Sequence, residues 1–242
     1  MEEIVLYGVV LLVLVARVYV VIAKEFMKIK RTKNNIKKFK TSKSKGNIIE
    51  ISNSSTNILL KDILLSRLYF FGRYKYIKDK KTGKTKYAYA YITKRNIRKQ
   101  ERKSIAHIKL DGWRQNLDVS KQTYNRCHII ASILGGVDDK INLITATRKL
   151  NQLMILYENK IQKYVTKTGK RVIYKVTPVY AHKNTLCKGV LMEAYSVSDK
   201  GDGVKFNIFI FNKQDDIKIN YKNGEYKSIN TKKSKISTNS KK

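Results

Sequence analysis

The spacing of apolar residues changes along the chain, and each spacing predicts a different element. Runs rich in β-branched and aromatic residues predict strands at residues 87–92, 171–180, 190–197 and 204–211. Turns that contain glycine precede or separate these runs. Between the first two runs, apolar residues recur near the helical period, which predicts an amphipathic helix over residues 147–163. These elements indicate an α+β fold with a central antiparallel sheet.

A different pattern occupies residues 4–23, which are nearly all apolar. At 1.5 Å per residue they are long enough to cross a hydrocarbon core of about 30 Å. Arg17 would cost about 2.5–3.5 kcal/mol at the bilayer centre, and the apolar residues outweigh that cost. Residues 1–24 are therefore expected to form an N-terminal transmembrane helix or a cleaved signal sequence. The acidic start, Glu2 and Glu3, favours the uncleaved anchor.

The segment after the apolar run is strongly basic. Residues 24–45 contain ten Lys or Arg and one acidic residue, Glu25. Residues 25–56 contain few apolar side chains, so we interpret them as a flexible basic linker that can bind anionic lipid headgroups. By the positive-inside rule, this charge favours the cytoplasmic side of a membrane.

The folded domain is expected over residues 57–226, and residues 227–242 are expected to be a solvated basic tail. The domain would open with a segment of helical period at residues 57–73. The turn at Gly112 is expected to bring the only tryptophan, Trp113, into the core.

The charge of the chain points to a polyanionic partner. Lys and Arg total 52 against 18 Asp and Glu, which gives a net charge of +34. Such a surface gathers nucleic acid first and anionic lipid second. We attribute roughly half of the excess to the codon bias of an AT-rich genome, so charge alone does not establish nucleic-acid binding. Two cysteines, Cys127 and Cys187, are too few for a disulfide scaffold, although they could pair with each other.

The candidate chemistry lies between residues 125 and 158. His128 stands at the edge of an apolar segment, and Asn142, Asn151 and Glu158 follow it. Asn151 and Glu158 are seven residues apart, so on a helix they share a face but are separated by roughly 10.5 Å of rise. Asn151 would therefore bind an ion directly, and Glu158 would act through a coordinated water. That arrangement suits Mg²⁺, which keeps much of its hydration shell.

These groups match the requirements of phosphodiester hydrolysis. Neutral His128 can accept the proton of an attacking water as a general base. A metal ion at Asn151 can polarise the phosphate and stabilise the leaving oxygen. The Arg126 guanidinium can offset phosphate charge.

An ordered series of motifs resembles the DNA/RNA non-specific endonucleases of the ββα-metal class, and most closely the bacterial DNA-entry nucleases. The resemblance covers about residues 67–226. It is carried by Ala88-Tyr89-Ala90-Tyr91-Ile92, Gly112-Trp113, Tyr124-Asn125-Arg126-Cys127-His128-Ile129-Ile130, Asn142-Leu143-Ile144-Thr145, Asn151, Tyr157-Glu158-Asn159, the run from Arg171 to Pro178 and the run from Gly189 to Ser196.

The resemblance implies a ββα-metal fold and a role for each matching residue. Arg126 and His128 fall on the family's arginine and general-base histidine, and Asn151 falls on its metal-binding asparagine. Asn142 and Glu158 fall on its supporting residues. Asn125 and Cys127 stand where the family usually has aspartate and glycine.

The family's activity supplies the expected function. Its members cut DNA, and often RNA, without base selectivity and usually with Mg²⁺, so we expect Mg²⁺ as the cofactor here, with Mn²⁺ as the alternative. Arg126 and Arg148 are expected to contact nucleic-acid phosphates. The alternative is a catalytically impaired nucleic-acid-binding or DNA-uptake protein on the same fold. Because family members are typically exported, we expect an outward-facing catalytic domain, against the charge rule.

Overall fold

The computed structural model describes residues 46–50, 74–98, 104–114, 123–181 and 183–229. All of these belong to one compact unit that begins at Gly46. The expected membrane anchor at residues 4–23, the segment of helical period at residues 57–73 and most of the expected linker and tail lie outside the described residues. Within the described ranges, no helix is both long and apolar enough to cross a membrane.

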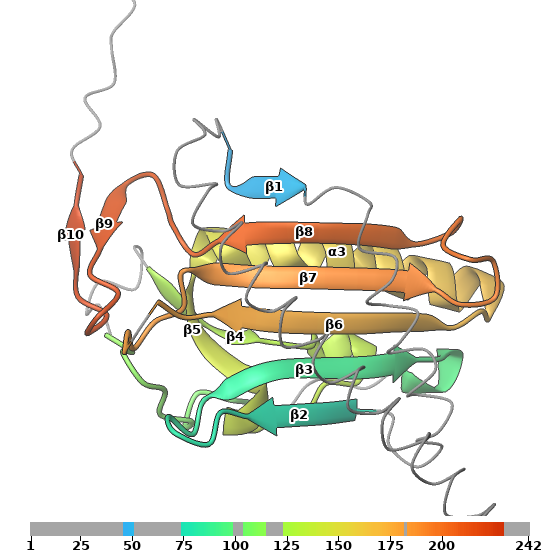
Figure 1. Ribbon diagram of the computed structural model, residues 1–242, viewed down its shortest axis with the longest axis horizontal. Coiled ribbons are helices and arrows are strands. Elements are labelled where there is room, and N and C mark those ends of the chain that lie inside the picture. The colour runs from blue at the N-terminus through green and yellow to red at the C-terminus, as the bar shows by residue number, and fades with distance from the viewer. Residues whose placement is uncertain (1–45, 51–73, 99–103, 115–122, 182, 230–242) are drawn as a thin grey trace, which may run out of the picture. The chain divides into compact units, whose positions relative to one another are not determined.

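A six-stranded antiparallel sheet forms the centre of the domain (Figure 1). Its strand order is β1-β8-β7-β6-β3-β2. The strands are β1 (Ile48–Glu50), β2 (Tyr74–Lys78), β3 (Thr85–Ile92), β6 (Val172–Val179), β7 (Gly189–Ser196) and β8 (Lys205–Phe211). The four strands expected from the sequence correspond to β3, β6, β7 and β8, so the predicted antiparallel sheet is confirmed.

The sheet also contains two strands that were not predicted from the sequence, β1 and β2. β1 pairs with β8 through Ile48 opposite Ile210, and it lies within the segment expected to be a linker. Separately from this sheet, β9 (Ile217–Ile219) and β10 (Tyr226–Ser228) form a small hairpin. Three-residue strands carry too short a pattern to be recognised in sequence.

One face of the sheet is covered by a second hairpin and a helix, which lie behind it in Figure 1. The hairpin consists of β4 (Tyr124–His128) and β5 (Leu143–Thr147), and the helix is α3 (Arg148–Thr168). A loop with two short 3₁₀ helices, η4 (Ser132–Leu134) and η5 (Lys140–Asn142), connects β4 to β5. A further 3₁₀ turn, η2 (Lys94–Asn96), follows β3.

Helix α3 begins and ends at recognisable caps. The Thr147 hydroxyl accepts a hydrogen bond from the Leu150 amide at 3.1 Å, and Gly169 ends the helix in the left-handed conformation with φ of 68°. The helix therefore begins one residue later and ends five residues later than predicted. Its apolar stripe is fully buried against the sheet and the hairpin and consists of Leu150, Met154, Ile161 and Val165.

The prediction that Trp113 enters the core is wrong. The ring is half-buried, and it lies outside both clusters of buried apolar residues. It packs instead against the Arg126 guanidinium, whose central carbon is 4.2 Å from the ring centroid. The π-face of the indole carries partial negative charge and attracts the guanidinium, which accounts for this contact.

Candidate active site

The β4–β5 hairpin fixes the direction of two predicted site residues. Arg126 pairs with Thr145 and His128 with Leu143 in an unbroken antiparallel register. Because side chains alternate along a strand, Arg126 and His128 share one face of the hairpin. Cys127, between them, faces α3, and its Sγ lies 3.5 Å from the Met154 Sδ.

Arg126 is held in a defined orientation before any ligand binds. Its Nε donates a hydrogen bond to the Ile108 carbonyl at 2.8 Å, and its guanidinium stacks on Trp113. Both partners come from the segment before β4. The contacts restrain the guanidinium, so less freedom would be lost when it binds a phosphate.

His128 lies at the end of β4 and is 8% exposed. Its Nε2 is 2.9 Å from the Asp138 Oδ1, and the other carboxylate oxygen of Asp138 accepts a hydrogen bond from the Arg98 Nη1 at 2.9 Å. Burial acts to raise the pKa of Asp138, but hydrogen bonds from Arg98 and His128 outweigh it and hold the pKa below its usual value. The carboxylate is thus ionised at neutral pH.

Asp138 and Arg98 were missed by reasoning from the sequence. The Gly135-Gly136 pair signals a turn soon after His128, and a carboxylate just beyond such a turn could have been suspected. Asp138 and Asp139 are adjacent, however, and only the structure distinguishes them. The Asp139 carboxylate points elsewhere and accepts from the Ile141 amide at 2.9 Å.

Asn142 is fully buried and fastens the loop between β4 and β5. Its side-chain oxygen accepts from the Ile130 amide, and its Nδ2 donates to the carbonyls of Ile130 and Val137, all at 2.9 Å. Every polar atom of the amide is therefore used inside the protein. The contacts that the structure gives Asn142 are to the backbone on both sides of the turn.

Glu158 reaches the same loop from the core side. Its Oε1 accepts from the Ala131 amide at 2.9 Å and from the Tyr174 hydroxyl at 3.1 Å. Burial raises the pKa of Glu158 to about 8, although these hydrogen bonds act in the opposite direction. The side chain is only 3% exposed, so its contacts in the structure are to backbone and Tyr174.

Asn151 and Arg148 lie at the N-terminal end of α3. Arg148 is exposed, and Asn151 is half-buried. Among the described residues, none forms a hydrogen bond with the Asn151 amide, so its oxygen is available as a ligand. No hydrogen bond joins Asn151 to Arg126 or His128 in the described part of the chain.

The donor chemistry of this unit suits a hard cation. The described residues contain no group of three or more His, Cys, Asp or Glu side chains that could hold a metal ion. A single amide oxygen such as that of Asn151 therefore suits an ion that keeps most of its waters, as Mg²⁺ does. The sequence predicts Asn151 as the direct ligand and Glu158 as a ligand through water, and this donor set stays a prediction, since the Glu158 contacts in the structure are to the Ala131 amide and Tyr174.

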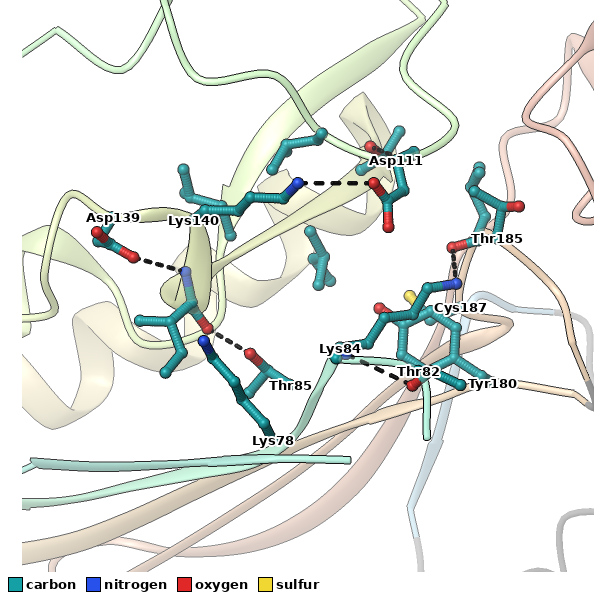
Figure 2. A pocket seen from close by; sticks show the side chains of 17 residues that line it. Lys78, Thr82, Lys84, Thr85, Asp111, Asp139, Lys140, Tyr180, Thr185 and Cys187 are labelled. Carbon is teal, nitrogen blue, oxygen red and sulfur yellow. Dashed lines mark hydrogen bonds and ion pairs between the residues drawn. The ribbon is translucent and has the colours of Figure 1, made fainter. Parts of the chain in front are cut away.

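A separate pocket of about 300 Å³ is lined by residues of β5, of the turn before β3 and of the segments near Asp111 and Thr185 (Figure 2). Lys84 points into it from the start of β3, bonded to the carbonyls of Asn184 and Thr185, and Lys140 lies 3.7 Å from Asp111. None of the six predicted site residues lines this pocket. The candidate site is therefore the polar face of the hairpin rather than this cavity.

The two cysteines are free thiols. Both are buried, and burial raises the pKa of each thiol above its usual value. Neither is suited to nucleophilic chemistry, because the thiolate is the reactive form.

Comparisons with known proteins agree with this geometry. Residues 68–198 match the family model described as DNA/RNA non-specific endonuclease. No curated protein matches the chain significantly. Among solved structures, NucA from Streptococcus agalactiae with a magnesium ion bound is similar with 26% identity and a TM-score of 0.56, over 64% of this chain and 77% of that one.

Two further structures share the fold. NucA from Streptococcus agalactiae without bound metal matches with 25% identity and a TM-score of 0.55, over 64% of this chain and 78% of that one. The Sda1 nuclease with a bound zinc ion matches with 24% identity and a TM-score of 0.54, over 64% and 81% respectively. Since the family model covers more than half of the sequence, this chain belongs to the DNA/RNA non-specific endonuclease family.

Proposed function

We propose that this protein is a metal-dependent endonuclease that hydrolyses phosphodiester bonds of DNA and RNA without selecting bases. The observation that carries the proposal is the β4–β5–α3 unit. Its hairpin presents Arg126 and His128 on one face, and its helix carries Asn151 with an amide oxygen that has no protein partner in the described chain.

The protein residues divide the chemistry between them. Neutral His128 accepts a proton from the attacking water as a general base. The guanidinium of Arg126, already oriented by Ile108 and Trp113, offsets charge on the phosphate oxygens. Asn142 and Glu158 hold the loop that follows His128, so the base stays in place during the reaction.

The Asn151 oxygen is the group that would hold the metal ion, which is Mg²⁺, with Mn²⁺ as an alternative. When bound, a divalent cation supplies Lewis-acid stabilisation of the phosphate and of the leaving oxygen. The similar NucA structure with bound magnesium and the Sda1 structure with bound zinc support a divalent cofactor.

Binding without base selection follows from the charge. With a net charge of +34, contacts to phosphates dominate, and phosphate contacts position a nucleic acid without reading its sequence. Arg148, which is exposed at the start of α3, would add a further phosphate contact.

A catalytically impaired protein on the same fold is the alternative. It is considered because Asn125 and Cys127 replace the aspartate and glycine that the family usually has. The structure favours the active enzyme at Cys127. The thiol packs against Met154, and β4 pairs with β5 continuously through that residue. The substitution of a glycine thus leaves the backbone that carries His128 regular.

Plasmid cleavage by the purified full chain tests the proposal. We expect Mg²⁺-dependent nicking and linearisation of the plasmid that EDTA abolishes. Cleavage of an RNA transcript should depend on Mg²⁺ in the same way. His128→Ala should lower the rate by at least about 10³-fold, whereas the exposed His107→Ala serves as the matched control and should leave it unchanged. A folded chain that retards DNA in a gel and never cuts it with Mg²⁺ or Mn²⁺ would establish the impaired alternative.

The proposal includes an outward-facing domain anchored through residues 4–23. Its support is the resemblance to exported nucleases and the apolar composition of that stretch. Protease added to intact cells that express the full chain should degrade the domain. Protection until the cells are lysed would place the domain inside.

A further inference from the structure

The imidazole of His128 already has a charged partner. A general base needs one ring nitrogen for the incoming proton, while the other nitrogen carries a proton and donates it. In the structure Nε2 lies 2.9 Å from the Asp138 carboxylate, which can only accept. Nε2 therefore carries the proton, and Nδ1 is the basic nitrogen.

Arg98 fixes the carboxylate in turn. Its Nη1 bonds to the Asp138 Oδ2 at 2.9 Å and to the Ser132 hydroxyl at 2.6 Å. The Arg98 backbone amide also donates to the Ile133 carbonyl at 3.0 Å. The arginine is thus attached at both ends to the loop that carries Asp138, which prevents the carboxylate from turning away from the ring.

The loop itself has little freedom. Beyond the bonds of Asn142 and Glu158, the Tyr74 hydroxyl donates to the Leu134 carbonyl at 2.7 Å, and the Gly136 amide donates to the Ala131 carbonyl at 3.0 Å. A Cβ at Gly136 would lie 1.9 Å from the Ile130 carbonyl oxygen, so the turn is packed backbone to backbone. The loop folds back so that Asp138, ten residues after His128, contacts the His128 ring.

We propose that Asp138 is a positioning residue for the base, and that Arg98 holds Asp138 in that position. This inference rests on the proposed function. The carboxylate keeps the proton on Nε2, orients the ring through a 2.9 Å hydrogen bond, and stabilises the imidazolium that forms when Nδ1 accepts the proton of water. One chain of hydrogen bonds thus runs from Arg98, which follows η2, through Asp138 to His128 at the end of β4.

Asp138→Asn separates this role from a purely structural one. The replacing amide has the same shape, but its single oxygen cannot accept from both Arg98 and His128. We expect kcat to fall by about 10²-fold, within the contribution of a general base, while KM changes by less than about threefold. The matched control is Asp139→Asn, which removes the same charge one residue away and should leave kcat within about threefold.

Arg98 gives a graded second measurement. Arg98→Lys keeps a charge near Asp138 but cannot bond to both the carboxylate and Ser132 in the same geometry. Its kcat should fall between those of the wild type and Asp138→Asn. Equal kcat values for Asp138→Asn and Asp139→Asn, or a fall that lies entirely in KM, would overturn the inference.

The ring can also be observed without any reaction. Long-range ¹H–¹⁵N spectra report which imidazole nitrogen carries the proton, and the chain has three histidines, so the His128 signal is identified by its loss in His128→Ala. We expect the Nε2–H form in the wild type and a mixture in Asp138→Ala. An Nδ1–H form in the wild type would overturn the inference.

The two readouts separate the two claims. If the wild-type chain never cuts nucleic acid although its ring is in the Nε2–H form, the proposed function fails, and the positioning role fails with it. If the wild type cuts and Asp138→Asn cuts equally fast, only the inference about Asp138 fails.

Discussion

Two carboxylates stabilise the loop after His128 from opposite sides, and their environments differ. Asp138 lies on the polar side, between Arg98 and His128, and these partners lower its pKa despite burial. Glu158 lies on the core side, bonded to the Ala131 amide and to Tyr174, and burial raises its pKa to about 8. One is a permanent charge at neutral pH, and the other is mostly a neutral carboxylic acid.

The difference shows what determines the role of a carboxylate. A charged neighbour offsets the loss of hydration at Asp138, whereas among the described residues Glu158 has one backbone amide and one phenol as hydrogen-bond donors. The polar side of the β4–β5–α3 unit can therefore support charge during a reaction. The core side mainly contributes stability, and the two functions should respond to different substitutions.

The largest expected effect on stability is at Glu158. Glu158→Ala leaves the Ala131 amide and the Tyr174 hydroxyl without their acceptor in the core, so we expect the free energy of unfolding to fall by about 3 kcal/mol. Urea denaturation at pH 7 measures it. Glu158→Gln, whose amide oxygen can replace Oε1, is the matched control and should lie within about 1 kcal/mol of the wild type. A loss below about 1 kcal/mol for Glu158→Ala would show that the loop does not depend on this bond.

Much of the fold was predictable, because its elements carry their own patterns. The β-branched and aromatic composition of β3, β6, β7 and β8 and the helical period of α3 result from burial of one or both faces. The prediction that Asn151 and Glu158 lie on one helix is confirmed. The burial of Glu158 depends on Tyr174 of β6, which no local pattern can reveal.

Candidate site residues could be proposed from the sequence only where they belong to a motif, and their roles stay predictions. Arg126, His128, Asn142 and Asn151 belong to such motifs. Asp138 and Arg98 are 40 residues apart in sequence, and their contact exists only because the loop folds back beside the end of β3. The orientation of Trp113 likewise depends on Arg126, a partner outside its own turn.

The next largest effect is the pH dependence of the free energy of unfolding that results from Glu158. Its pKa is about 8 in the folded protein and near 4.5 when unfolded, so the folded state binds the extra proton between these values. Stability from this group is therefore present below pH 4.5 and is lost as the pH rises towards 8. Relative to Glu158→Gln, the wild type should lose about 2 kcal/mol between pH 5 and pH 7.

Urea denaturation of both proteins at several pH values measures this difference. Taking the difference removes groups that both proteins share, such as Asp138, whose lowered pKa acts in the opposite direction. If the difference between the two proteins did not change with pH, Glu158 would be ionised in the core, and the contrast between the two carboxylates would be lost.

A smaller loss of stability is expected from a substitution at Gly136, in the loop that both Asp138 and Glu158 stabilise. Gly136→Ala would place a methyl group against the Ile130 carbonyl and the Asn142 amide. We expect a loss of about 1.5 kcal/mol in the free energy of unfolding and a reduced cleavage rate, because Asp138 follows this turn. Gly46→Ala is the control, since its nearest atom lies 4.0 Å from the added Cβ. Equal stability and cleavage rate for both variants would mean that the turn relaxes without moving Asp138.

The smallest effect should come from Cys127, which adjoins His128 in sequence but faces the core. Cys127→Ala removes a buried sulfur that contacts Met154, so we expect a loss of about 1 kcal/mol in stability. The side chain lies on the opposite face of β4 from Arg126 and His128, so kcat should stay within about twofold of the wild type. Urea denaturation and plasmid cleavage measure the two quantities on the same sample. A large fall in kcat without a matching loss of stability would mean that the core face reaches the chemistry, and the division between the two sides of the unit would have to be abandoned.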